Sequence, residues 1–186
     1  HQVTVVTQPD RPAGRGKQLK ATEVALAYPN ALKPESEAEL QEVLKGSDLL
    51  ITIGYGQILK TQTLAVPAYG GINLHFSLLP RWRGAAPVQW AILSGDEKTG
   101  FTIFKLDKGL DTGPTYLSDE IPLSDKAKTP DVLAKLAELG AEGFVDVLPR
   151  MGRERATPQS INGVTIAPKI TKEMAKVNWK KSSIEI

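Results

Sequence analysis

An asparagine and a histidine two positions apart, and an aspartate further along the chain, are the residues best suited to chemistry. Asn73 and His75 lie within residues 71–75, and Asp111 lies in the glycine-punctuated segment 107–113. A reaction through a tetrahedral oxyanion needs a hydrogen-bond donor for the oxygen and a group that moves protons. The Asn73 amide can donate. His75 can donate when it is protonated, and Asp111 can hold it in that form.

Each of these residues also has a structural interpretation. A lone histidine after a strand is more often structural than catalytic, Asn73 could cap a turn, and Asp111 could be a turn residue before Gly113. The combination favours chemistry, because side chains alternate along a strand and Asn73 and His75 would share one face. Ligands of open α/β sheets bind at the carboxyl ends of strands, which is where this pair falls.

The elements that must position these side chains alternate between strand and helix patterns. Hydrophobic patterns and turn residues predict strands at 3–6, 49–53, 72–76, 101–106 and 115–123, and helices at 21–28, 35–45, 87–93 and 130–148, the last capped by Thr129. The apolar run 49–53 is typical of a parallel strand covered on both faces. Residues 153–169 fit two short strands around the Asn162-Gly163 turn, and the tail from Glu173 is expected to be helical and then frayed. The alternation predicts an α/β fold with an open, mostly parallel sheet and flanking helices.

Composition excludes several kinds of site. The 186 residues include no cysteine and two histidines, which argues against disulfides, zinc–thiolate sites and multi-histidine metal sites, so no metal is expected. No apolar run approaches the roughly 20 residues that span a bilayer. The net charge of +2 does not demand a nucleic-acid partner. Residues 8–20, however, hold four basic side chains and one acidic one, a local charge of +3.

Two segments resemble the signature of enzymes that use 10-formyltetrahydrofolate as a formyl donor. The first reads Asn73-Leu74-His75-Phe76-Ser77-Leu78-Leu79-Pro80-x-x-Arg83-Gly84-x-x-Pro87, and the second runs from Thr99-Gly100-Phe101-Thr102 to Asp107-x-Gly109-x-Asp111-Thr112-Gly113. Phe76 is a departure, since many relatives have glycine there. The resemblance implies a Rossmann-like catalytic domain in which Asn73, His75 and Asp111 form the catalytic set.

The resemblance also implies the reaction, which is transfer of the formyl group from folate N10 to an amine. Asn73 and protonated His75 would stabilise the oxyanion, while Asp111 would orient His75 and help to remove the amine proton. No metal would take part. The folate co-substrate would lie against Tyr55, Gly56, Ile58, Leu59, Ser77, Leu78, Leu79, Pro80 and Gly109.

The segment from Thr7 to Lys17 resembles a loop of those family members that formylate methionyl initiator tRNA. The resemblance implies contacts with the acceptor arm from Arg11, Arg15, Lys17 and Lys20. Basic side chains bind phosphates, and the glycines on both sides of Arg15 let the protein backbone approach the tRNA strand closely. The expected protein is a monomeric enzyme of translation initiation without a membrane partner. Its expected location is the cytoplasm, with an organelle as the alternative.

The extent of the resemblance predicts the domain organisation. Residues 1–176 would be a catalytic domain that lacks the family's first strand, glycine-containing loop and first helix, and residues 177–186 would be a linker toward a C-terminal barrel-like domain. A missing first strand would expose apolar sheet surface, so this segment alone is expected to be unstable or inactive.

Several alternatives remain open on the sequence. The same catalytic set could formylate an amino sugar nucleotide or glycinamide ribonucleotide, or hydrolyse formyl-folate, although the basic segment argues against these acceptors. A non-catalytic RNA-binding module is compatible with the basic segment but leaves the catalytic set without a role. A nicotinamide-dependent enzyme is disfavoured, because Gly54-Tyr55-Gly56 lacks the third glycine of the dinucleotide fingerprint.

Overall fold

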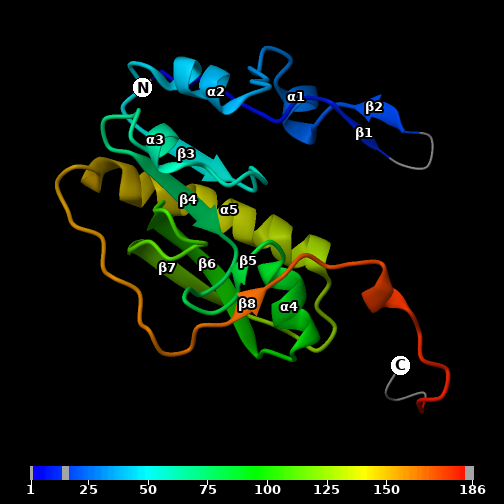
Figure 1. Ribbon diagram of the computed structural model, residues 1–186. Coiled ribbons are helices and arrows are strands. Elements are labelled where there is room, and N and C mark those ends of the chain that lie inside the picture. Colours follow the sequence, from blue (N-terminus) through cyan, green and yellow to red (C-terminus); the bar gives the residue numbers. More distant parts are fainter. Residues whose placement is uncertain (1, 14–16, 183–186) are drawn as a thin grey trace.

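The computed structural model describes residues 2–13 and 17–182, and Figure 1 shows how their elements are arranged. Along the chain the elements are β1 (Arg11–Ala13), β2 (Gln18–Lys20), α1 (Glu23–Ala27), α2 (Glu37–Leu44), β3 (Leu50–Ile53), α3 (Thr61–Leu64), β4 (Gly71–His75), β5 (Arg83–Gly84), α4 (Pro87–Leu93), β6 (Lys98–Lys105), β7 (Thr115–Pro122), α5 (Thr129–Val147), the 3₁₀ turns η1 (Leu148–Arg150) and η2 (Glu173–Ala175), and between these turns β8 (Ile166–Ala167).

A four-stranded sheet of order β3-β4-β6-β7 forms the centre of the molecule. The predicted α/β class is confirmed, but the pairing within these strands is mixed. β3 and β4 are parallel, whereas β6 pairs antiparallel with both β4 and β7. The chain passes from β6 to β7 through residues 106–114 without a helix, and such a short connection joins antiparallel strands. The expectation of a mostly parallel sheet is therefore wrong for these four strands.

The core lies between this sheet and α5, the long helix that crosses the sheet in Figure 1. The buried side chains that form it are Ile72, Leu74, Phe101 and Ile103 from the strands, Val88 from α4, and Val132, Leu136, Phe144 and Val147 from α5. Gly140 lets α5 approach the sheet closely, since a Cβ there would lie 2.5 Å from Leu74 Cδ2. β4, whose carboxyl end carries the predicted catalytic pair, is thus packed directly against α5 in this core.

Most predicted elements are confirmed within two or three residues, and five further expectations are corrected. Residues 3–6 form no strand; Val6 makes a single bridge to Leu32. β3 is not covered on both faces, because Ile51 and Ile53 are 40% and 53% exposed. Thr129 is the first residue of α5 and not its cap, since Lys128 takes the cap position without a side-chain bond.

The fourth correction concerns residues 153–169, which form no hairpin around Asn162-Gly163. β8 pairs in parallel with β5, and Thr157 makes an antiparallel bridge to Thr115. This segment therefore runs across the loops that follow β4 and β6. The predicted helix in the tail is a single 3₁₀ turn, η2. Within the described ranges, no helix has the length and apolar character needed to cross a membrane.

Candidate functional site

Asn73 is held on β4 by its neighbour on β3. The register places Thr52 opposite Asn73, and the Thr52 hydroxyl donates to Asn73 Oδ1 over 2.9 Å. The amide oxygen is thereby occupied, which leaves the amide nitrogen as the hydrogen-bond donor of this side chain. Asn73 and His75 are two positions apart on one strand, so they share a face of the sheet as predicted.

His75 is a buried residue, 5% exposed, and both of its ring nitrogens face fixed partners. Nε2 lies 2.8 Å from the carbonyl oxygen of Trp82; because a carbonyl can only accept, Nε2 donates and carries a hydrogen. Nδ1 faces Asp111 Oδ2 across 3.6 Å. Burial lowers the pKa of His75, against the opposing effects of the Asp111 charge and the Trp82 carbonyl. Burial thus favours the neutral ring, in which Nδ1, on the side of Asp111, carries the lone pair.

Asp111 is held in an unusual backbone conformation with φ of +51°. Its Oδ2 atom accepts from the backbone nitrogen of Gly84 over 2.7 Å. Earlier in the same loop, Asp107 Oδ1 accepts from the Gly109 nitrogen over 2.9 Å and from the Thr112 hydroxyl over 2.7 Å. Non-glycine residues adopt this backbone region when surrounding contacts hold them there. The loop thus presents a carboxylate to His75 in a defined position.

The loop that supplies the Trp82 carbonyl is also well anchored. Trp82 itself has φ of +62°, and its indole nitrogen donates to Asp96 Oδ2 over 2.8 Å. Arg81 pairs with the same carboxylate over 2.6 and 2.9 Å, and the pKa of Asp96 is lowered by this guanidinium. The Trp82 backbone nitrogen donates to Thr165 Oγ1 over 2.8 Å. Asp96 and Thr165 therefore hold Trp82 in place, and the Trp82 carbonyl oxygen orients the His75 ring by accepting from Nε2.

The residues predicted to bind folate fall into two groups in the structure. Tyr55 and Gly56 line a cavity of about 330 Å³, whereas Ile58, next to them in sequence, is 86% exposed. The second group comprises Ser77, Leu78, Leu79, Pro80 and Gly109, which lie in the loops after β4 and β6 and not around this cavity. Ser77 is fully buried, and its hydroxyl donates to the Arg81 carbonyl over 2.6 Å, so its side chain stabilises the loop.

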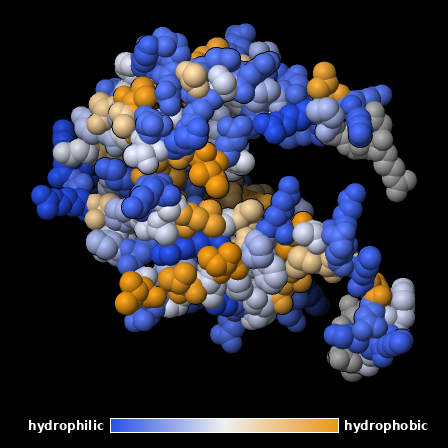
Figure 2. Space-filling view, viewed as in Figure 1, coloured by the Kyte–Doolittle hydropathy of each residue, from blue (hydrophilic) through white to orange (hydrophobic). Residues whose placement is uncertain are grey.

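Arg11, Lys17 and Lys20, three of the four predicted tRNA-binding residues, lie on the hairpin formed by β1 and β2. Figure 2 shows this hairpin as a mostly hydrophilic arm that stands out from the body of the molecule. Arg11, Lys17 and Lys20 are exposed, and Lys20 pairs with Glu23 on the surface over 3.2 Å. Arg15 lies outside the described residues.

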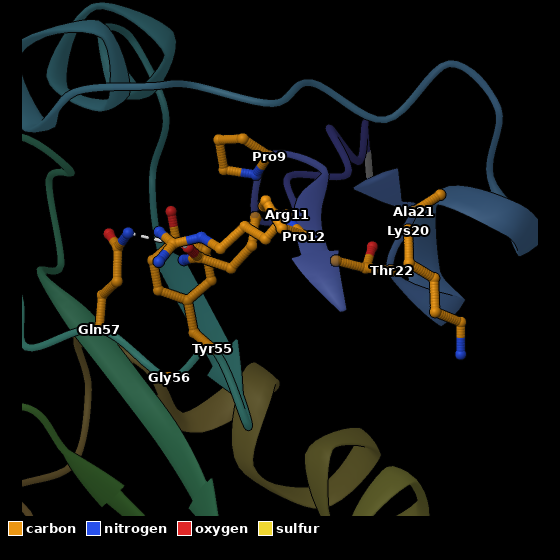
Figure 3. Close-up of a pocket in the computed structure, with 10 residues that line it drawn as sticks. Pro9, Arg11, Pro12, Lys20, Ala21, Thr22, Tyr55, Gly56 and Gln57 are labelled. Atoms are coloured by element: carbon orange, nitrogen blue, oxygen red, sulfur yellow. Dashed lines mark hydrogen bonds between the residues drawn. The ribbon is translucent and has the colours of Figure 1, made fainter. Parts of the chain in front are cut away.

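The hairpin is connected to the predicted folate-binding region by hydrogen bonds. Arg11 and Lys20 line the same cavity as Tyr55, and in Figure 3 Arg11 and Gln57 lie on the Tyr55 side of it, whereas Lys20 points away. Gln8 Oε1 accepts from Arg11 Nη2 over 3.0 Å and from Gln57 Nε2 over 2.8 Å. The basic segment is thus joined to the loop after β3 through Gln8.

Several residues that hold the site were not predicted from the sequence. The clearest is Gln159, which lies 48 positions after Asp111 yet donates to the Asp111 carbonyl. Thr52, Asp96 and Thr165 are further examples. A polar residue in a segment without periodicity carries no signal in one sequence, so these contacts became visible only in the fold.

Gly113 determines how closely the Asp111 loop approaches β6. A Cβ at Gly113 would collide with the carbonyl oxygen of Lys105, which is backbone and cannot move aside. We expect Gly113→Ala to lower the free energy of unfolding by at least about 1–3 kcal/mol, the usual cost of overpacking, and to lower kcat by displacing Asp111. Urea denaturation measures the first effect, and steady-state rates measure the second.

The control for this variant is Gly163→Ala. Gly163 has a φ of +80°, so alanine there costs about 1–2 kcal/mol of backbone strain, but nothing lies within 4 Å of the position that the new methyl group would take. This control should therefore lose some stability and keep the parent kcat. Equal kcat values for the two variants would contradict the role assigned to Gly113.

The fold and the arrangement of these side chains suit one kind of chemistry. An α/β sheet carries an amide donor and a His–Asp pair beside β4, an arrangement that fits transfer through a tetrahedral intermediate. Residues 1–148 match the formyl transferase family, and the chain belongs to that family. It is 39% identical to a methionyl-tRNA formyltransferase of Thermodesulfovibrio yellowstonii over 98% of this chain and 62% of that protein. Identity to the Nocardioides methionyl-tRNA formyltransferase is 45%, over 99% of this chain and 61% of that protein.

Solved structures confirm the Rossmann-like α/β class. A Helicobacter canadensis N-formyltransferase in complex with folinic acid and dTDP-3-aminofucose has a TM-score of 0.71 and 20% identity, over 96% of this chain and 65% of that one. A formyltransferase of Anoxybacillus kamchatkensis, in complex with a UDP-linked formamido sugar and tetrahydrofolate, has a TM-score of 0.62 and 27% identity, over 76% of this chain and 72% of that one. The chain spans about 60% of the length of the curated relatives it matches.

Proposed function

We propose that this chain transfers the formyl group of 10-formyltetrahydrofolate to the amino group of methionyl initiator tRNA. The observation that carries the proposal is the position of the basic hairpin, whose Arg11 and Lys20 line one cavity with Tyr55 and Gly56. Relatives 39–45% identical over nearly the whole chain are methionyl-tRNA formyltransferases, which supports this acceptor. The tetrahydrofolate in the Anoxybacillus structure supports the donor.

The wider setting belongs to the same proposal. The enzyme acts as a monomer in translation initiation in the cytoplasm, without a metal. Residues 1–176 form its catalytic domain and residues 177–186 a linker. The position of η2 supports this division, because it is the last helix or strand in the described part of the chain and ends at Ala175.

In the proposed reaction the amine attacks the formyl carbon, and a new C–N bond forms as the carbonyl oxygen becomes an oxyanion. The Asn73 amide nitrogen donates to this oxyanion, a role favoured by the Thr52 hydroxyl that already occupies the amide oxygen. The expected second donor, a protonated His75, fits the geometry less well. Its Nε2 hydrogen is given to Trp82, and burial favours the neutral ring.

We therefore assign His75 to proton transfer. The neutral Nδ1 takes the proton that the attacking amine releases, and the imidazolium so formed is stabilised by Asp111, 3.6 Å away. The C–N10 bond of the donor then breaks, and the proton passes from Nδ1 to N10 of the leaving tetrahydrofolate. Atoms and charges balance without a covalent enzyme intermediate.

The acceptor assignment predicts a specific effect of the basic hairpin. The double substitution Arg11→Ala and Lys17→Ala should raise KM for methionyl initiator tRNA and leave kcat unchanged, because the hairpin binds phosphates and does not touch the reacting atoms. Each lost phosphate contact should reduce the dependence of log affinity on log salt by about 0.7 to 0.9. KM measured over a series of KCl concentrations tests this.

The matched control for that experiment is Lys45→Ala, which removes an exposed lysine that pairs with Glu42 on α2, away from the hairpin. This control should keep the KM and the salt dependence of the parent. If the hairpin variant also keeps them, the hairpin does not bind tRNA.

The function itself is tested with the full-length protein, 10-formyltetrahydrofolate and three acceptors in parallel. These are charged methionyl initiator tRNA, an amino sugar nucleotide, and water alone. Product with the tRNA supports the proposal. Turnover with the sugar nucleotide or water, and none with tRNA, would support 10-formyltetrahydrofolate as the donor. It would contradict methionyl initiator tRNA as the acceptor. No turnover with any of them would favour a non-catalytic RNA-binding module.

A further inference from the structure

Gln159 joins the two loops that carry the proposed catalytic machinery. Its Nε2 atom donates to the carbonyl oxygens of Asp111, over 2.9 Å, and Gly113, over 2.7 Å. Its Oε1 atom accepts from Arg83 Nε over 3.2 Å and Nη2 over 2.7 Å. Both donors and the acceptor of the amide are thus used, and the side chain is half-buried between the loops.

An amide is well suited to this position. It donates twice from one end and accepts from a guanidinium at the other, whereas a carboxylate could keep the Arg83 contact but not donate to the two carbonyls. The segment around Gln159 is itself fixed. Thr157 exchanges two backbone hydrogen bonds of 2.8 Å with Thr115, and β8 pairs with β5 at Arg83.

The Asp111 backbone needs such a support. Its φ of +51° is a conformation that non-glycine residues keep only when neighbouring contacts impose it. Gly84 holds the carboxylate through its nitrogen, and Gln159 holds the main-chain carbonyl of the same residue. Since Arg83 directly precedes Gly84, Gln159 fixes both the aspartate and the strand that its carboxylate contacts.

We propose that Gln159 is a positioning residue of the formyl-transfer site, which keeps the Asp111 carboxylate opposite His75. This inference rests on the proposed function. It concerns a residue that lies beyond residue 148, where the match to the family ends, so the segment after the family domain completes the site.

The first test compares Gln159→Met, Gln159→Glu and a control in the full-length protein. Methionine keeps the volume and loses every hydrogen bond, while glutamate keeps the acceptor for Arg83 and loses the donors. Both variants should lower kcat about 10- to 100-fold with little change in KM, because small misplacements of catalytic groups cost this much. Gln41→Met, which removes a half-buried glutamine that donates to Thr63 far from these loops, should keep the parent kcat. Parent-like activity of Gln159→Glu would overturn the proposal, since it would show that holding Arg83, and not Asp111, is what matters.

The second test asks whether Gln159 acts through Asp111. In an Asp111→Asn background the carboxylate is already lost, so Gln159→Met should lower kcat less than about twofold. The same 10- to 100-fold loss in that background would count against the positioning role, since it would show an effect independent of the carboxylate.

A third measurement does not depend on formyl transfer. NMR titration of the His75 ring should give a lower pKa in Gln159→Met than in the parent, because Asp111 is the ionisable group whose charge favours the imidazolium. An unchanged pKa would overturn the positioning role, even if the protein uses another acceptor. If the pKa falls while no acceptor is formylated, the positioning role stands and the proposed function fails.

Discussion

Replacement of His75 by alanine is expected to lower kcat for formyl transfer about 10²- to 10⁴-fold, the usual contribution of a positioned proton-transfer group. The substitution removes Nδ1, the atom that faces Asp111, and with it the proposed acceptor for the amine proton. Folate affinity should change little, because the His75 ring is 5% exposed and offers little surface for folate to bind. Single-turnover rates with charged methionyl initiator tRNA, measured at saturating donor, check the prediction.

The control for this variant has to separate chemistry from folding, since alanine leaves the Trp82 carbonyl without its donor. A second variant, His75→Gln, retains an amide that can donate to that carbonyl but cannot exchange a proton near neutral pH. Both variants should be inactive, and the glutamine variant should melt closer to the parent. A glutamine variant with near-parent kcat would show that His75 is structural and that another group moves the proton.

The sequence was informative about the parts of the site that follow from local rules. Strand alternation placed Asn73 and His75 on one face, and the glycine-punctuated segment after an apolar strand predicted the Asp111 loop. Helix signals located α4 and α5 closely, because proline at the first turn and a 3.6-residue period are local features.

What could not be predicted depends on contacts between distant segments. The direction of β6 was missed because this antiparallel strand is buried on both faces, so it has the continuous pattern that is typical of a parallel strand. The lowered pKa of His75 follows from burial, and the hydrogen on Nε2 follows from the Trp82 carbonyl, and both are properties of the packed site. Gln159 reaches Asp111 because β8 returns to pair with β5, and that pairing joins residues more than 80 positions apart.

The charge of Asp111 is the other feature on which the proposed mechanism depends. Asp111→Asn should lower kcat about 10²-fold or more, because the imidazolium that forms when His75 takes up the amine proton loses its counter-charge. The asparagine oxygen can still accept from Gly84, so the loop should remain in place. Steady-state rates and thermal melting of the same preparation separate these two effects.

The pH dependence of kcat/KM gives a second test of Asp111→Asn, and the direction of the expected shift can be stated in advance. Burial places the pKa of His75 below its usual value of about 6.5, and the Asp111 charge partly offsets that shift. If neutral His75 is the active form, kcat/KM of the parent is constant at higher pH and falls as the pH drops through this pKa. Asp111→Asn removes the raising influence, so the pKa falls further and the acid limb moves to lower pH. An acid limb that moves to higher pH, or an activity that instead requires a protonated His75 and falls on the alkaline side, would reverse the assigned roles. In that case His75 would act as the oxyanion donor after all, and its Nε2 hydrogen would have to leave the Trp82 carbonyl when substrate binds.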